Sequence, residues 1–153
     1  MSNATSAQTT MTAGLRTYRG SCHCGAVRFE ADFDPSTGTT RCNCRVCTKA
    51  GWWGILVKPS AFRLLSGKEL LSDYTRSEAG HARFCKVCGI RTFGHGNIPE
   101  VGGDYYSVNL NCLDGVDLSG VPVRYLDGLH NTWAELAVAP YVNPFVAAAA
   151  VVE

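Results

Sequence analysis

The sequence lacks a strong excess of charge of either sign. Its 153 residues contain 14 Lys and Arg against 13 Asp and Glu. A balance so close to neutral provides no basic field that would attract phosphate backbones or acidic membrane surfaces. We therefore expect no nucleic-acid partner, and the chain length predicts one domain that is large enough to bury its own core.

Long hydrophobic runs are also absent. The longest, PFVAAAAVV near the C-terminus, is far below the ~20 residues that a membrane-spanning helix needs. The opening stretch, MSNATSAQTTMTAG, contains neither a basic residue nor the apolar run of a secretory signal. These features predict a disordered leader at residues 1–16, no membrane partner and a cytoplasmic location.

Cysteine, in contrast, is abundant, with eight residues in the chain. In a cytoplasmic protein this number favours metal binding over disulfides. Cysteines one or two residues apart are poor disulfide partners, but their sulfurs can reach one zinc ion at ~2.3 Å. A single C-x-x-C could instead be a redox pair, but no βαβ pattern surrounds the one found here. Seven of the eight cysteines form three close groups: Cys22 and Cys24; Cys42, Cys44 and Cys47; Cys85 and Cys88.

Hydrophobic patterning predicts strands through most of the chain. AVRFEADF alternates apolar and polar residues, as does YYSVNLNCL, whereas WWGILVK is a continuous apolar run typical of a strand buried on both faces. AFRLL predicts a further strand, and VPVRYL predicts an edge strand because its proline cannot donate a hydrogen bond. A short helix is expected over residues 131–137, with Asn131 as its cap. The fold class is therefore mainly β, with antiparallel sheets and few short helices.

The seven clustered thiols divide naturally into four plus three. Four cysteines from the C-x-C and C-x-x-C groups would close a tetrahedral, structural zinc site. The C-x-C-x-x-C group would then supply three ligands to a second ion, and its fourth position would be available for catalysis.

Other divisions of the ligands stay open. Cys112 could complete a second four-cysteine site, although its place on an apolar strand face favours packing as a small hydrophobe. A zinc ribbon that combines Cys85 and Cys88 with two cysteines of the C-x-C-x-x-C group would leave Cys22 and Cys24 unused. The remaining candidates for a fourth ligand are the histidines: His23, His81, His95 and His130.

Four segments, in order and spacing, resemble the glutathione-dependent formaldehyde-activating enzymes and the related centromere protein V domain. These segments are RGSCHCGAVRFEA, RCNCRVCTKAG, FRLLSGKELLSDY and RFCKVCGIRTF. The resemblance implies a β-rich fold called the β-tent and two zinc ions per chain, one structural and one catalytic. The implied structural ligands are Cys22, Cys24, Cys85 and Cys88. The implied catalytic ligands are Cys42, Cys44 and Cys47.

The resemblance also implies a reaction, the addition of a small thiol such as glutathione to formaldehyde, as in a carbon–sulfur lyase acting in the synthetic direction. A thiol that binds zinc ionises at neutral pH, which is consistent with this chemistry. Basic side chains near the three cysteines could hold the carboxylates of glutathione, and an aromatic side chain could line the cleft. These candidates are Arg41, Arg45, Lys49 and Trp52.

The alternative function is a non-catalytic binding or scaffold module in which both zinc ions are structural. The centromere relative suggests this class, but the chain lacks the basic extension that such a role would be expected to use. We assign residues 17–138 to the zinc domain and residues 139–153 to an apolar tail. Because the segment VAPYVNPFVAAAAVV is unusually apolar, we expect it either to pack on its own domain or to cover a partner, and a homodimer is a further hypothesis.

Overall fold

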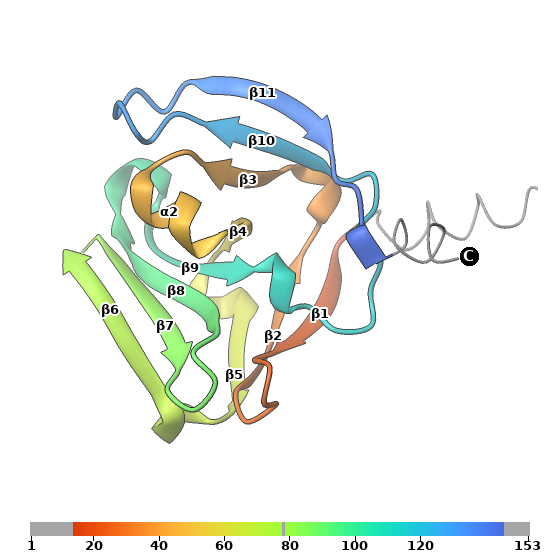
Figure 1. Ribbon diagram of the computed structural model, residues 1–153, viewed down its shortest axis with the longest axis vertical. Coiled ribbons are helices and arrows are strands. Elements are labelled where there is room, and N and C mark those ends of the chain that lie inside the picture. Colours follow the sequence, from red (N-terminus) through yellow and green to blue (C-terminus); the bar gives the residue numbers. More distant parts are fainter. Residues whose placement is uncertain (1–13, 78, 146–153) are drawn as a thin grey trace, which may run out of the picture. The chain divides into compact units, whose positions relative to one another are not determined.

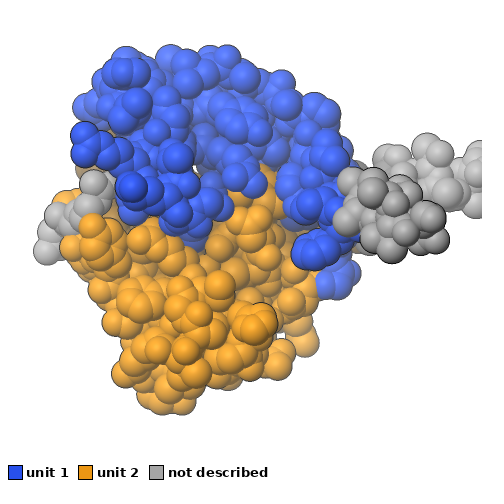
Figure 2. Space-filling model, in the orientation of Figure 1, with its two compact units in different colours: residues 1–15, 34–52, 115–153 blue, residues 16–33, 53–114 orange. Residues whose placement is uncertain are grey.

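The computed structural model describes residues 14–77 and 79–145. The chain divides into two compact units (Figure 2). Unit 1 contains residues 1–15, 34–52 and 115–153, and unit 2 contains residues 16–33 and 53–114. Strands are the main elements of the described residues, as Figure 1 shows, so the predicted mainly β class is confirmed. The described residues include no helix long and apolar enough to cross a membrane.

The first sheet of unit 2 has the strand order β1-β2-β5, and both pairings are antiparallel. Its strands are β1 (Arg16–Ser21), β2 (Arg28–Phe33) and β5 (Phe62–Ser66). In β2, Phe29 and Ala31 are fully buried and Phe33 nearly so, while the residues between them reach solvent. The alternation in the sequence therefore predicted the buried face of this sheet correctly.

The other strands of unit 2 belong to a second sheet, in the order β4-β9-β8-β7-β6, and their pairings with one another are antiparallel. Aromatic side chains pack against one of its faces: the Phe62 ring lies 4.5 Å from that of Tyr106 and 4.6 Å from that of Phe93. The strands are β4 (Gly54–Val57), β6 (Leu71–Ser77), β7 (Gly80–Cys85), β8 (Arg91–Ile98) and β9 (Gly103–Asn109). Short 3-10 turns accompany them: η2 (Pro59–Ala61), η3 (Lys68–Leu70), η4 (Pro99–Val101) and η5 (Leu110–Cys112).

Two sequence expectations are wrong in this unit. The WWGILVK strand is not buried on both faces, because the Leu56 side chain is 49% exposed. The YYSVNLNCL strand ends at Asn109, where the Asn109 side chain accepts a hydrogen bond from the Asn111 N–H and caps η5. Leu110 and Cys112 are buried on that turn and not on a strand face.

Unit 1 contains the strand order β11-β10-β3, the helix α2 (Arg45–Ala50) and the 3-10 turn η1 (Pro35–Thr37). Its strands are β3 (Thr39–Cys42), β10 (Pro122–Leu126) and β11 (Glu135–Pro140). β10 pairs antiparallel with β11 and parallel with β3, so the predicted edge strand is wrong. Pro122 is tolerated because it is the first residue of its strand, where the missing N–H costs least.

The predicted helix over residues 131–137 is also wrong. Asn131 and Trp133 have φ angles of 59° and 58°, which no α-helix accommodates. Backbone hydrogen bonds join Asp127 to both Trp133 and Ala134, so this segment is the turn between β10 and β11. Polar turn-forming residues outweighed the weak helix propensity of TWAELA.

The predicted leader and tail are only partly among the described residues. Residues 1–13 of the leader and residues 146–153 of the tail lie outside them. Within the described part, Val142 and Phe145 are 70% and 83% exposed. The boundaries assigned to leader, domain and tail stay a prediction.

Candidate metal centres

Four sulfur atoms converge in unit 2 from chain segments about sixty residues apart. Cys22 and Cys24 follow β1, while Cys85 ends β7 and Cys88 lies in the turn before β8. Their Sγ atoms all lie within 4.8 Å of one another. The Sγ atom of Cys24 is 3.6 Å from that of Cys22 and 3.7 Å from that of Cys85. Four sulfurs at ~2.3 Å from a zinc ion would be ~3.8 Å apart, so this group fits a tetrahedral zinc ion.

Backbone hydrogen bonds shape the loops that carry these sulfurs. The Val27 N–H donates to Cys22 Sγ at 3.3 Å, and the Gly89 N–H closes the second turn on the Cys85 carbonyl at 2.7 Å. Gly89 has a φ of 80°, a conformation that glycine adopts without strain. Although burial opposes ionisation of Cys88, hydrogen bonds from two backbone N–H groups and from neighbouring thiols lower its pKa to about 6. The loop therefore favours the thiolate of Cys88, the form that binds metal, whereas a hydrogen bond from the Ala26 backbone is outweighed by those from neighbouring thiols, which raise the pKa of Cys24 to about 11.

Three sulfur atoms converge in unit 1. Cys42 ends β3, Cys44 is the N-cap of α2 and Cys47 lies in the first turn of this helix. Their Sγ atoms also lie within 4.8 Å of one another. Among the described residues of unit 1, no histidine or carboxylate joins this group. The donor set fits a zinc ion with three protein thiolates.

The helix start differentiates these thiols electrostatically. Burial alone would raise the pKa of Cys44, but hydrogen bonds from the backbone N–H of Cys47 and from neighbouring thiols outweigh it and lower the pKa. Burial, together with the Cys44 thiol, raises the pKa of Cys47 to about 12. As the pH rises, Cys44 therefore ionises at a lower pH than Cys47 does. A bound cation would be needed to hold all three thiols as thiolates near neutral pH.

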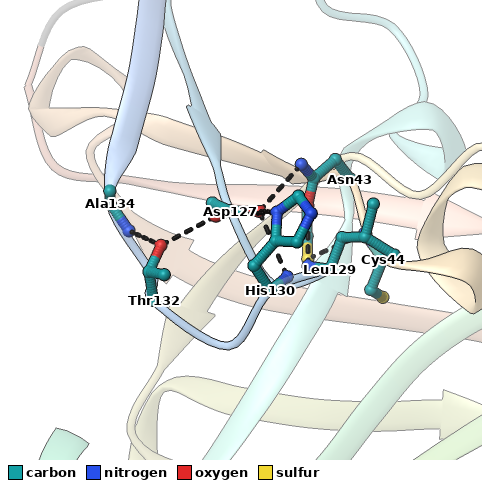
Figure 3. A network of polar contacts seen from close by, with 8 residues as sticks. Asn43, Cys44, Asp127, Leu129, His130, Thr132 and Ala134 are labelled. Atoms are coloured by element: carbon teal, nitrogen blue, oxygen red, sulfur yellow. Dashed lines mark hydrogen bonds and ion pairs between the residues drawn. The ribbon is translucent and has the colours of Figure 1, made fainter.

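A polar network supports the loop between Cys42 and Cys44 (Figure 3). The Asn43 amide donates to Asp127 Oδ1 at 3.1 Å and accepts from the Leu129 N–H at 2.8 Å. Asp127 is only 7% exposed, and it also accepts hydrogen bonds from the Thr132 hydroxyl and the His130 N–H. Donation from Asn43 and Thr132 lowers the pKa of Asp127 to about 2. An ionised carboxylate therefore ties the β10–β11 turn to the cysteine loop.

Gly128 lies in the same turn, directly against the cysteine loop. A Cβ atom at this position would overlap Cys42 Sγ and would lie 3.0 and 3.1 Å from two ring atoms of Trp133. Sequence analysis missed this contact and the Asp127 network. The DGLHN stretch indicated a turn, but nothing in it showed which loop the turn would contact.

The other predicted site residues of unit 1 surround the three cysteines in the sequence. Arg45 and Lys49 are exposed on α2, and Arg41 lies on β3 opposite Tyr125. Trp52 is half-buried, whereas the next residue, Trp53, is 1% exposed and belongs to the core of unit 2. The roles of Arg41, Arg45, Lys49 and Trp52 in substrate binding stay predictions.

The alternative ligands have other surroundings. Cys112 is 7% exposed, its sulfur donates to the Arg91 carbonyl, and burial raises its pKa to about 12. The four-sulfur group of unit 2 is complete without it. His23 is exposed, and His130 contacts Asp127 through Nδ1. His81 and His95 stack on each other in unit 2, with ring centroids 4.6 Å apart.

The chain matches a known protein family and is similar to a solved structure. Residues 17–124 match the family described as glutathione-dependent formaldehyde-activating enzyme. The chain belongs to this family. The formaldehyde-activating family is associated with glutathione and formaldehyde, and its matched region contains all eight cysteines. The chain is also similar to a Rhodobacter sphaeroides protein of known crystal structure, with 31% identity and a TM-score of 0.57. That match covers 65% of this chain and 90% of the other.

Proposed function

We propose that the chain catalyses the addition of a small thiol, glutathione or a relative, to formaldehyde or a related aldehyde. The observation that supports this proposal most directly is the three-sulfur group of Cys42, Cys44 and Cys47, which has no fourth protein donor among the described residues of unit 1. Membership of the glutathione-dependent formaldehyde-activating family supports the same reaction. Cys22, Cys24, Cys85 and Cys88 would hold a second, structural zinc ion.

The reaction balances without an oxidant or reductant. The thiol sulfur forms a bond to the aldehyde carbon, the carbonyl π bond breaks, and the thiol proton ends on the resulting oxygen, so that RSH and HCHO give RSCH2OH. Zinc bound at such a site stabilises the thiolate form of a thiol at neutral pH. The chain's own contribution is to hold Cys42 and Cys44 in place through the Asn43–Asp127 network and α2. Holding two reactants together supplies much of the acceleration in such additions.

Arg41, Arg45 and Lys49 are the proposed partners of the glutathione carboxylates, and Trp52 is the proposed wall of the cleft. The cytoplasmic location, the lyase classification, the β-tent arrangement and a homodimer belong to the same proposal. In the alternative function, a scaffold module, the second ion would be structural as well.

The test combines zinc content with the rate of adduct formation. We expect two zinc ions per chain and, by exchange NMR with 13C-formaldehyde and glutathione, adduct formation faster than the uncatalysed background. Cys44→Ser should lose one zinc ion and the acceleration. Cys112→Ser, which removes a thiol outside the four-sulfur group, should retain both. Two zinc ions without acceleration, whatever the thiol, would favour the scaffold module.

A further inference from the structure

Unit 2 contains a pocket that the cysteine chemistry does not use. Its volume is about 530 Å³, within the ~300–1,000 Å³ range of small-molecule sites. None of the cysteines lines it. Its apolar wall is formed by Phe62 and Leu64 from β5, Phe93 from β8 and Tyr106 from β9. The Phe62 and Tyr106 rings stack on each other, with centroids 4.5 Å apart and an interplanar angle of 11°, so this wall is a compact aromatic cluster.

The sheet register places charged and polar groups beside this wall. Arg83 pairs with Phe93 and His95 pairs with Tyr106, so the cationic and aromatic side chains share one face of the sheet. Arg83 and His95 both line the pocket, and Arg83 Nη1 lies 3.3 Å from His95 Nε2. Burial lowers the pKa of His95, helped by repulsion from His81 and Arg83. A neutral His95 can accept this hydrogen bond, but it brings no negative charge to Arg83.

Within residues 14–77 and 79–145, no carboxylate forms an ion pair with Arg83, and Asp73 interacts with it only through longer-range charge attraction. Asp73 is its register partner on β6, but the Asp73 carboxylate accepts hydrogen bonds from His81 and Thr75, each at 2.7 Å. The Arg83 Nε–H is buried and has no hydrogen-bond partner. A buried donor on a charged group is costly without an acceptor, so an acceptor from a ligand would be stabilising.

The rim of the pocket carries exposed charges of both signs, Lys68 and Glu69. Together with Arg83 they leave one net positive charge at the pocket, which favours an anion. The planar guanidinium fork matches a carboxylate in particular, because it can donate two parallel hydrogen bonds. We propose that this pocket binds a small carboxylate with a flat apolar body, with the carboxylate at Arg83 and the body against Phe62, Phe93 and Tyr106. This inference goes beyond the proposed reaction and requires no thiol.

Benzoate is a suitable probe because it combines a carboxylate with a flat apolar ring, and benzamide is its neutral isostere. Titration of the zinc-loaded full chain, followed by 1H–15N NMR, should give saturable benzoate shifts centred on β8 and β9. We expect benzamide and inorganic phosphate to bind at least about tenfold more weakly, because a charged hydrogen bond and the ring contact both contribute. Equal binding of benzoate and benzamide would overturn the proposal, as would shifts centred outside the pocket or no saturation at 20 mM.

Two pairs of variants test the contacts. Arg83→Gln should weaken benzoate binding by about tenfold or more, whereas Arg91→Gln, in the same sheet but outside the pocket lining, should leave it within about twofold. Because Arg83→Gln alters a partly buried residue, the second pair uses exposed lysines. Lys68→Glu should weaken binding about threefold, and Lys86→Glu, outside the lining, should not. If Lys68→Glu and Lys86→Glu bind benzoate with equal affinity, the charge of the pocket plays no role in binding. This result would hold even if Arg83→Gln failed to fold.

Discussion

The close approach of Gly128 to the cysteine loop makes it a precise test of the three-sulfur group. Gly128→Ala adds one methyl group whose position overlaps Cys42 Sγ and lies 3.0 Å from the Trp133 ring. The φ angle of Gly128 lies outside the left-handed region, so alanine introduces no backbone strain there. Trp133 is 57% exposed and can move, but the Cys42 sulfur can move only by leaving its place beside the other two sulfurs. The added methyl group should therefore act mainly on metal binding.

The size of the effect follows from the cost of overpacking. Inserting a methyl group into a filled space typically costs ~1–3 kcal/mol, and ~1.4 kcal/mol corresponds to a tenfold change in an equilibrium constant. We expect the affinity of one of the two proposed zinc ions to fall by about 5–150-fold, and adduct formation to fall with it at limiting zinc. The affinity of the other ion should not change, because the four-sulfur group lies wholly in unit 2.

Competition with a chromophoric zinc chelator measures both affinities in one titration. Gly80→Ala is the matched control, since the nearest atom to its added Cβ would be the Tyr105 hydroxyl at 3.4 Å, an ordinary contact. If Gly128→Ala binds both zinc ions as tightly as the wild type does, the overlap does not constrain Cys42, and our account of this loop is incorrect. The same conclusion would follow if Gly80→Ala weakened zinc binding equally.

Three further predictions concern stability. Cys88→Ser should lower the melting temperature by more than ~10 °C in a thermal scan. A structural zinc contributes several kcal/mol to folding, and ~1 kcal/mol shifts the midpoint by ~2–4 °C for a chain of this size. An unchanged midpoint would show that the four-sulfur group is not structural. Trp53→Ala should cost ~3–5 kcal/mol in urea unfolding and Trp52→Ala only ~1–2, and equal losses would contradict their different burial. Hydrogen bonds from Arg63 and Thr17 lower the pKa of Asp32 to about 2, so its stabilisation is complete above pH ~3.9 and is lost as the pH falls towards 2. Urea midpoints of the wild type should therefore fall more steeply over this range than those of Asp32→Asn, and parallel pH profiles would refute the assignment.

The sequence by itself determined the features that depend on neighbouring residues. Alternation in AVRFEADF predicted the buried face of β2, because successive side chains in a strand point to opposite sides. The spacing of Cys42, Cys44 and Cys47 predicted that their sulfurs would converge, since a short turn limits how far they can separate. The cysteine pattern was also sufficient to predict the family.

Features that depend on residues distant in the chain were decided only by the tertiary structure. The place of β10 between β3 and β11 could not be read from VPVRYL, because a proline at the start of a strand is compatible with an edge or an interior position. The contacts of Asp127 with Asn43 and of Arg83 with His95 likewise depend on which strands pair and in which register. A shift of one residue in that register turns every side chain to the other face, so local patterns in the sequence cannot specify these contacts.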